Sequence, residues 1–136
     1  MGPRILVVDD EKFIAETLSL ILQVHGYAAT SALSGAQAIA LASEFCPDLL
    51  LCDATMPGMN GFEAGVLIKQ RCPDCHLIFF SDHPISAEFA EKSEIPRAHG
   101  YQYDVVTKPL DAPLLLDRIK ALFREDAEPQ ALGTTP

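Results

Sequence analysis

Basic residues are scarce in this sequence. Lysine and arginine together number 10 against 19 acidic residues, and the formal net charge is -9. A protein that binds nucleic acid generally carries a basic surface that displaces counterions from the phosphates. The composition therefore argues against nucleic acid as a partner, and it disfavours anionic membrane surfaces for the same reason. The simplest role for the excess of acidic residues is solubility.

Long apolar runs are also missing. The chain has no stretch of about 18 apolar residues, the length that suggests a membrane-spanning helix. A strand-like run begins at residue 4, and nothing before it has the layout of a secretory signal peptide. We therefore expect no membrane contact and a location in the cytoplasm.

Cysteine is represented by four residues, Cys46, Cys52, Cys72 and Cys75. In a chain of this size we expect reduced thiols and not a disulfide framework. Cys72 and Cys75 have only His76 close by, too few ligands for zinc, and a redox pair normally opens a helix after a strand. The prediction for this pair is a structural or incidental role.

The sequence does contain enough apolar residues for one folded domain. Its 136 residues are 49% hydrophobic, which is sufficient for a core without disulfides or a structural metal. Residues 127–136 show no hydrophobic periodicity. We expect them to form a disordered tail behind a domain that spans residues 1–126.

Apolar strand-like runs alternate with segments of helical periodicity. The expected strands cover residues 4–9, 27–33, 48–53, 76–81 and 104–107. The expected helices cover residues 11–25, 34–45 and 60–71, and a final helix follows residue 111. This alternation predicts an α/β fold, a doubly wound parallel sheet of five strands with helices on both faces.

Capping signals support three of the helix starts. Ser34 with Gln37, and Asn60 with Glu63, have the spacing of a capping box. Asp111 can cap the final helix through its carboxylate.

Polar side chains end the strand-like runs at one predicted edge of the sheet. Asp9 and Asp10 follow the first run, Asp53 ends the third, Ser81 the fourth, and Lys108 follows the fifth. The carboxyl ends of parallel strands carry the functional groups in such sheets. Three carboxylates brought together need a cation, and hard oxygen ligands suit Mg²⁺ or Mn²⁺. A carboxylate can also act as a nucleophile toward phosphorus, with lysine and metal offsetting the negative charge.

The same residues form motifs of a known family. Residues 7–10 (VVDD), 53–61 (DATMPGMNG) and 107–110 (TKPL) together resemble response-regulator receiver domains, and the likeness covers about residues 4–124. The resemblance implies a flavodoxin-like strand order of 2-1-3-4-5. It also implies Asp53 as the phosphoacceptor.

The resemblance further implies a role for each neighbouring residue. Asp10 would ligate the metal directly, Asp9 mainly through water, and Thr55 through its backbone carbonyl, with Asp53 as a further ligand. Ser81 and Lys108 would contact the phosphoryl group. The Lys108–Pro109 peptide bond would be cis.

The segment between Ser81 and Lys108 departs from the family. It is a few residues longer than usual and contains Pro84, Pro96 and Gly100, so we expect a short, displaced or irregular fourth helix. The family commonly places a switching aromatic three residues before the lysine, where this chain has Val105. We expect the aromatic switch to be absent, with Tyr103 as the alternative candidate.

Asp82 and His83 are further departures beside the expected site. The family favours a small residue at the position of Asp82, and a carboxylate there would repel a phosphoryl group or attract the metal. By family analogy His83 and Thr55 border the path of the attacking water, so both could tune the lifetime of the phosphoryl group.

These features predict a phosphorylation switch that works with a histidine kinase or a phosphotransfer protein. The chain would catalyse only its own phosphorylation and dephosphorylation, and would not be a turnover enzyme. We expect no output domain in this chain, and therefore output by binding to a downstream protein, to a second copy of the chain or to a phosphorelay intermediate. Two alternatives stay open: a receiver-like binding module that is not phosphorylated in practice, and a hydrolase that uses Asp53 as its nucleophile.

Overall fold

The computed structural model describes residues 2–127, with side chains through residue 124, and its centre is a five-stranded sheet in the order β2-β1-β3-β4-β5. All neighbouring strands are parallel. The strands are β1 (Arg4–Val8), β2 (Ala28–Ala32), β3 (Leu49–Asp53), β4 (His76–Ser81) and β5 (Asp104–Thr107). The predicted fold class and strand order are therefore confirmed.

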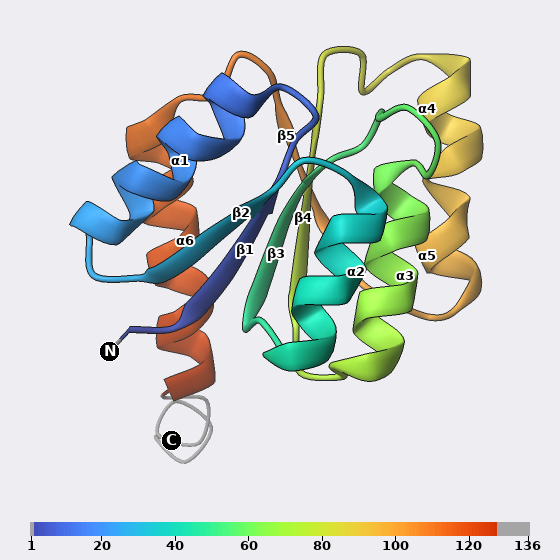
Figure 1. Cartoon of the computed structure of the whole chain (residues 1–136). Helices are drawn as coiled ribbons and strands as arrows, with labels where there is room; N and C mark the ends of the chain where they lie inside the picture. Colours follow the sequence, from blue (N-terminus) through green and yellow to red (C-terminus); the bar gives the residue numbers. More distant parts are fainter. Residues whose placement is uncertain (1, 128–136) are drawn as a thin grey trace, which may run out of the picture.

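Helices cover both faces of the sheet (Figure 1). Helices α1 (Lys12–Val24) and α6 (Ala112–Ala127) lie on one face. The other face carries α2 (Gly35–Glu44), α3 (Gly61–Arg71), α4 (Ala87–Lys92) and α5 (Glu94–Ala98). No helix within residues 2–127 is long and apolar enough to cross a lipid bilayer. The predicted tail, 127–136, lies outside the described residues except for Ala127, which ends α6.

The central strands are continuous apolar runs because both of their faces are covered. Every residue of β3 is buried, and so are the last five residues of β4. Successive side chains alternate between two core clusters: Leu50 and Phe79 pack toward α2 and α3, and Leu51 and Phe80 toward α1 and α6. The sheet is thereby packed against helices on both faces.

The predicted helix caps are present. Asn60 and Glu63 form a full capping box, with each side chain accepting from the other residue's backbone N–H. Asp111 accepts from the backbone N–H of Leu114. Ser34 caps α2 by accepting from the N–H of Gln37, but the Gln37 side chain accepts from Leu33 and not from Ser34. Each cap satisfies N–H groups that the helix itself cannot.

The fourth helix is irregular, as expected: it is split into the short helices α4 and α5 at Ser93. Pro96 is the third residue of α5, where its missing N–H costs nothing because first-turn N–H groups have no partner in the helix. Gly100 lies just after the C-cap of α5 and has a positive φ of 77°, a conformation that glycine adopts readily.

The expectation of four reduced thiols is wrong for two of them. Cys46 and Cys72 form a disulfide, while Cys52 and Cys75 are free and buried. The Cα atoms of Cys46 and Cys72 are 5.5 Å apart, which is the usual spacing for a disulfide. Packing of α2 beside α3 brings them together across 26 residues of sequence, and no pattern along the chain reveals that contact.

Candidate functional site

Four adjacent strands deliver polar side chains to the same edge of the sheet. Asp9 directly follows β1, Asp53 ends β3, Ser81 ends β4 and Lys108 directly follows β5. Asp9, Asp53 and Ser81 are buried, with 0%, 7% and 5% of their surface exposed. The structure therefore brings together the residues that the sequence predicted.

Lys108 joins the two buried carboxylates. Its Nζ donates to Asp9 Oδ2 at 3.1 Å and to Asp53 Oδ2 at 3.0 Å. Burial alone would lower the pKa of Lys108, but the hydrogen bonds and charges of Asp53 and Asp9 outweigh burial and raise that pKa above its ordinary value. Lys108 is thus held as a cation at the centre of the site.

The Asp53 carboxylate is fixed from both ends. Oδ2 accepts from Lys108, and Oδ1 accepts from the backbone N–H of Thr55 at 3.0 Å. Burial raises the pKa of Asp53 above its ordinary value, although the hydrogen bonds from Lys108 and Thr55 oppose this rise. Both pKa values rise because the pair is not symmetric: Lys108 faces two acids, whereas Asp53 faces one cation and loses water on burial.

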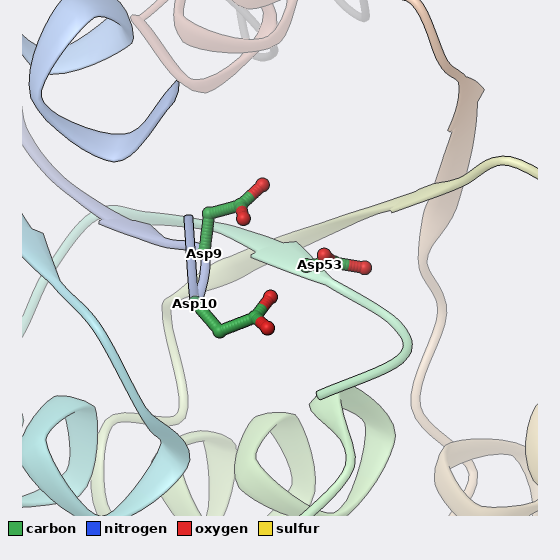
Figure 2. A group of neighbouring side chains, drawn as sticks. All are labelled: Asp9, Asp10 and Asp53. Carbon is green, nitrogen blue, oxygen red and sulfur yellow. The ribbon is translucent and has the colours of Figure 1, made fainter. Parts of the chain in front are cut away.

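Three carboxylates can contribute to a cation site here. One oxygen each from Asp9, Asp10 and Asp53 lies within 4.8 Å of the others. Figure 2 shows the three side chains gathered beside the ends of β1 and β3, with Asp10 reaching toward Asp53. The donors are all hard oxygens, and three acids exceed the single positive charge of Lys108. The residues therefore fit a hard divalent cation such as Mg²⁺.

A polar cleft of about 640 Å³ opens over these groups. Asp10, Asp53, Thr55, Ser81 and Lys108 line it, and so do the exposed side chains of Asp82 and His83. Asp82 thus lies in the same cleft as Asp53, as it must if its carboxylate is to repel a phosphoryl group or attract the metal. One wall was missed from the sequence: Ser86, Phe89 and Lys92 from the start and body of α4. No sequence signal places them there, because the position of the split fourth helix depends on tertiary packing.

Ser81 occupies the cleft and also shapes the local backbone. Its Oγ accepts from the N–H of His83 at 3.0 Å, which leaves the hydroxyl proton able to donate into the cleft. Ser86, and not Ser81, caps α4. The Ser81 carbonyl accepts from the backbone N–H of Lys108 at 2.9 Å, and the Lys108–Pro109 bond is cis as expected.

The two switch candidates lie away from the carboxylates. Tyr103 donates its hydroxyl proton to the carbonyl of Ser93 at 3.2 Å, and its ring centroid is 5.5 Å from that of Phe79. Val105 pairs with Phe79 in the sheet register. Neither residue lines the cleft over Asp53.

A doubly wound sheet with three acids, a serine and a lysine at its carboxyl edge defines a receiver domain of the signalling type. The comparison with known proteins agrees: a family model described as the response regulator receiver domain matches residues 5–120. The chain belongs to this family.

One curated relative is the phosphate regulon transcriptional regulatory protein PhoB of Rhizobium meliloti (strain 1021). It is 34% identical over 137 residues, an alignment that includes 98% of this chain. The chain spans little more than half of that regulator, 57% of its length. The likeness thus leaves the rest of PhoB without a counterpart in these residues.

Two solved structures support the fold. A CheY-like receiver domain protein from Methanospirillum hungatei JF-1 has a TM-score of 0.82 and 26% identity, covering 94% of this chain and 98% of that chain. The response regulator TrrA from Thermotoga maritima, solved in complex with Mg(2+)-BeF, has a TM-score of 0.70 and 30% identity. The coverage there is 90% of this chain and 99% of TrrA.

Proposed function

We propose that this receiver domain accepts a phosphoryl group on Asp53 from a histidine kinase or a phosphotransfer protein. The observation that carries the proposal is the placement of Lys108 Nζ between Asp9 and Asp53, with Asp10 beside them in the cleft. A lysine shared by two buried carboxylates is costly as a structural pair alone. The same arrangement is useful where negative charge arrives and must be offset.

The chain's own residues have defined tasks in this reaction. An oxygen of Asp53 attacks the phosphorus of the donor, the bond from phosphorus to the donor breaks, and the donor leaves with that electron pair. The Thr55 N–H and the Lys108 ammonium hold the carboxylate in place before the attack. Lys108 and the Ser81 hydroxyl then face the oxygens of the transferred group across the cleft.

A divalent cation completes the proposed site. Asp10 and Asp53 would hold it directly, Thr55 through its backbone carbonyl, and Asp9 through water. Mg²⁺ or Mn²⁺ would supply positive charge that offsets the phosphoryl oxygens. The three-carboxylate cluster supports this assignment, and so does the similarity to TrrA, which was solved with Mg(2+)-BeF.

The proposed output is a protein–protein contact, with a downstream protein or a second copy of the chain. In this role the domain catalyses only its own phosphorylation and dephosphorylation and turns over no external substrate. The likeness to a transcriptional regulator favours a location of this chain in the cytoplasm. The net charge of -9 disfavours direct contact with nucleic acid.

The test is intact mass spectrometry after treatment with acetyl phosphate and Mg²⁺. We expect a gain of one phosphoryl group, and no gain in Asp53→Asn. Asp74→Asn is the matched control, because Asp74 is an exposed acid just before β4, at the opposite edge of the sheet. A wild-type chain that gains no mass would support a binding module, and continuous turnover of acetyl phosphate without a stable adduct would support a hydrolase.

A further inference from the structure

The disulfide lies at the edge of the sheet opposite to Asp53. Cys46 is in the loop between α2 and β3, and Cys72 is the C-cap residue of α3. β3 starts after Cys46 and runs to Asp53, so the length of a strand separates the sulfur chemistry from the carboxylates. The ring closed by the disulfide contains β3, the loop after Asp53 and all of α3.

The two bonded cysteines differ in access to solvent. Cys46 is exposed, whereas Cys72 is buried with 3% of its surface exposed. Of the two residues, Cys46 is therefore the one that a small thiol or disulfide in solution can approach. Because one cysteine is exposed and the other is buried, thiol–disulfide exchange with a molecule in solution would begin at Cys46.

The surroundings also accommodate the reduced state. The sulfur of Cys46 lies 3.8 Å from the carbonyl oxygen of Arg71, and that of Cys72 lies 3.9 Å from the carbonyl oxygen of Ala42. After reduction each thiol, a weak donor, would thus have a carbonyl oxygen within reach as its acceptor. Both carbonyls belong to the C-terminal turns of α2 and α3 and not to the sheet.

The other two cysteines cannot take part. Cys52 and Cys75 are buried, with 0% and 1% of their surface exposed. Burial raises the pKa of Cys75 to about 12, and burial also raises the pKa of Cys52 above its ordinary value. At neutral pH both remain thiols, and the thiolate is the form that exchanges.

We propose that Cys46 and Cys72 form a reversible redox site, at which a low-molecular-weight disulfide such as oxidised glutathione closes a cross-link between α2 and α3. The Cys46 thiolate attacks one sulfur of the small disulfide, forms a mixed disulfide and releases one thiolate. The Cys72 thiolate then attacks the Cys46 sulfur and releases the second. Two protein thiols are oxidised, one small disulfide is reduced to two thiols, and the protons pass to the released thiolates. The site is independent of the function proposed for Asp53.

The first test is equilibration of the whole chain in glutathione buffers of graded redox ratio. The sample is then denatured, alkylated with iodoacetamide and weighed by intact mass spectrometry. We expect four alkylated cysteines in the reducing buffers and two in the oxidising buffers, with a peptide map that joins Cys46 to Cys72. Four alkylated cysteines at every ratio would overturn the proposal, as would a cross-link that excess reduced glutathione does not open.

The second test is thermal unfolding of the same samples. Closing a loop of this length restricts the unfolded chain, so oxidation should raise the Tm by roughly 10 °C. Cys46→Ser removes an exposed sulfur, so it should fold normally and lose the redox-dependent shift. Cys75→Ala should keep the shift. A shift that persists in Cys46→Ser, or vanishes in Cys75→Ala while that variant still folds, would show that other sulfurs are involved.

Discussion

Asp9 and Asp10 are neighbours in sequence, but their carboxylate oxygens differ in how free they are to bind a metal ion. Asp9 is fully buried, and its two oxygens accept from the N–H of Glu11 and from Lys108. Asp10 is exposed, and the described part of the chain gives its carboxylate no hydrogen-bond donor. Asp10 is therefore the acid with the most coordination capacity to offer. This division supports the direct and water-mediated roles that the family resemblance implies for Asp10 and Asp9.

Because Asp10 is exposed, substituting it should disturb the fold little, so this residue is well suited to a test of cation binding. We expect Mg²⁺ at a hundred times its Kd to raise the Tm of the wild-type chain by roughly 10 °C, because binding to the folded state alone stabilises it. Asp10→Asn should lose most of this response without a large change in the Tm of the metal-free chain. Thermal unfolding with and without Mg²⁺ measures both, and Asp74→Asn should respond as the wild type does. An undiminished response in Asp10→Asn would contradict the assignment.

Asp53 should make the metal-free domain sensitive to pH. The pKa of Asp53 is raised in the folded chain, so the folded state holds the Asp53 proton more tightly than the unfolded state does. The stability that this protonation contributes to the fold is fully present below the unfolded pKa of about 4. That stability is lost as the pH rises through the folded pKa. Without divalent cations, Asp53→Asn should therefore raise the Tm at pH 7, and the difference from the wild type should shrink toward pH 4. A lower Tm for Asp53→Asn at pH 7 would show that the ion pair with Lys108 outweighs the cost of burial.

At the scale of elements, the start of α3 determines the shape of the loop after Asp53. Gly61 is the first residue of α3, and its N–H donates to the carbonyl of Ala54 at 2.9 Å. A Cβ at residue 61 would overlap the backbone carbonyl of Asp53. The capping box of Asn60 and Glu63 fixes the helix start at the same point. Close backbone contact, and not a turn conformation, explains the glycine here.

Two glycines at helix starts give a matched comparison. Gly35 begins α2, and a Cβ there would meet only the flexible side chain of Met59, at 2.9 Å from its sulfur. We expect Gly61→Ala to lower the free energy of unfolding by about 2 kcal/mol, since backbone must move. Gly35→Ala should change it by less than about 1 kcal/mol, because Met59 can turn aside and alanine favours the helix. Urea denaturation measures both, and equal effects would contradict the reading of the Asp53 contact.

Some elements follow from the sequence pattern alone, and others do not. The strands β4 and β5 were predicted with their observed bounds, and the polar residues at the strand ends predicted the site, because apolar runs ending in acid depend only on local pattern. The Cys46–Cys72 bond and the α4 wall of Phe89 and Lys92 were missed. Both depend on which helices lie side by side, and no periodicity along the chain carries that information.

At the scale of the whole molecule, a cluster of aromatic rings connects the cleft to the junction of α4 and α5. Phe62 lines the cleft, and its ring centroid lies 5.3 Å from that of Phe89 and 6.0 Å from that of Tyr103. Tyr103 in turn bonds to Ser93 at the junction of α4 and α5. The cluster therefore joins α3, α4 and the segment before β5. Packed aromatic rings thus run from the cleft to Tyr103. This chain of contacts does not require an aromatic residue at position 105, where the family commonly has one.

Tyr103→Phe separates a packing role from a switching role. The ring contacts stay in place and only the hydrogen bond to Ser93 is lost, so we expect the free energy of unfolding to fall by about 1 kcal/mol. The rate of mass gain with acetyl phosphate should not change, because the hydroxyl does not line the cleft. Urea denaturation and timed intact mass spectrometry measure the two effects on the same samples. A changed rate with unchanged stability would instead place Tyr103 in the response to phosphorylation, since a structural bond would alter stability first.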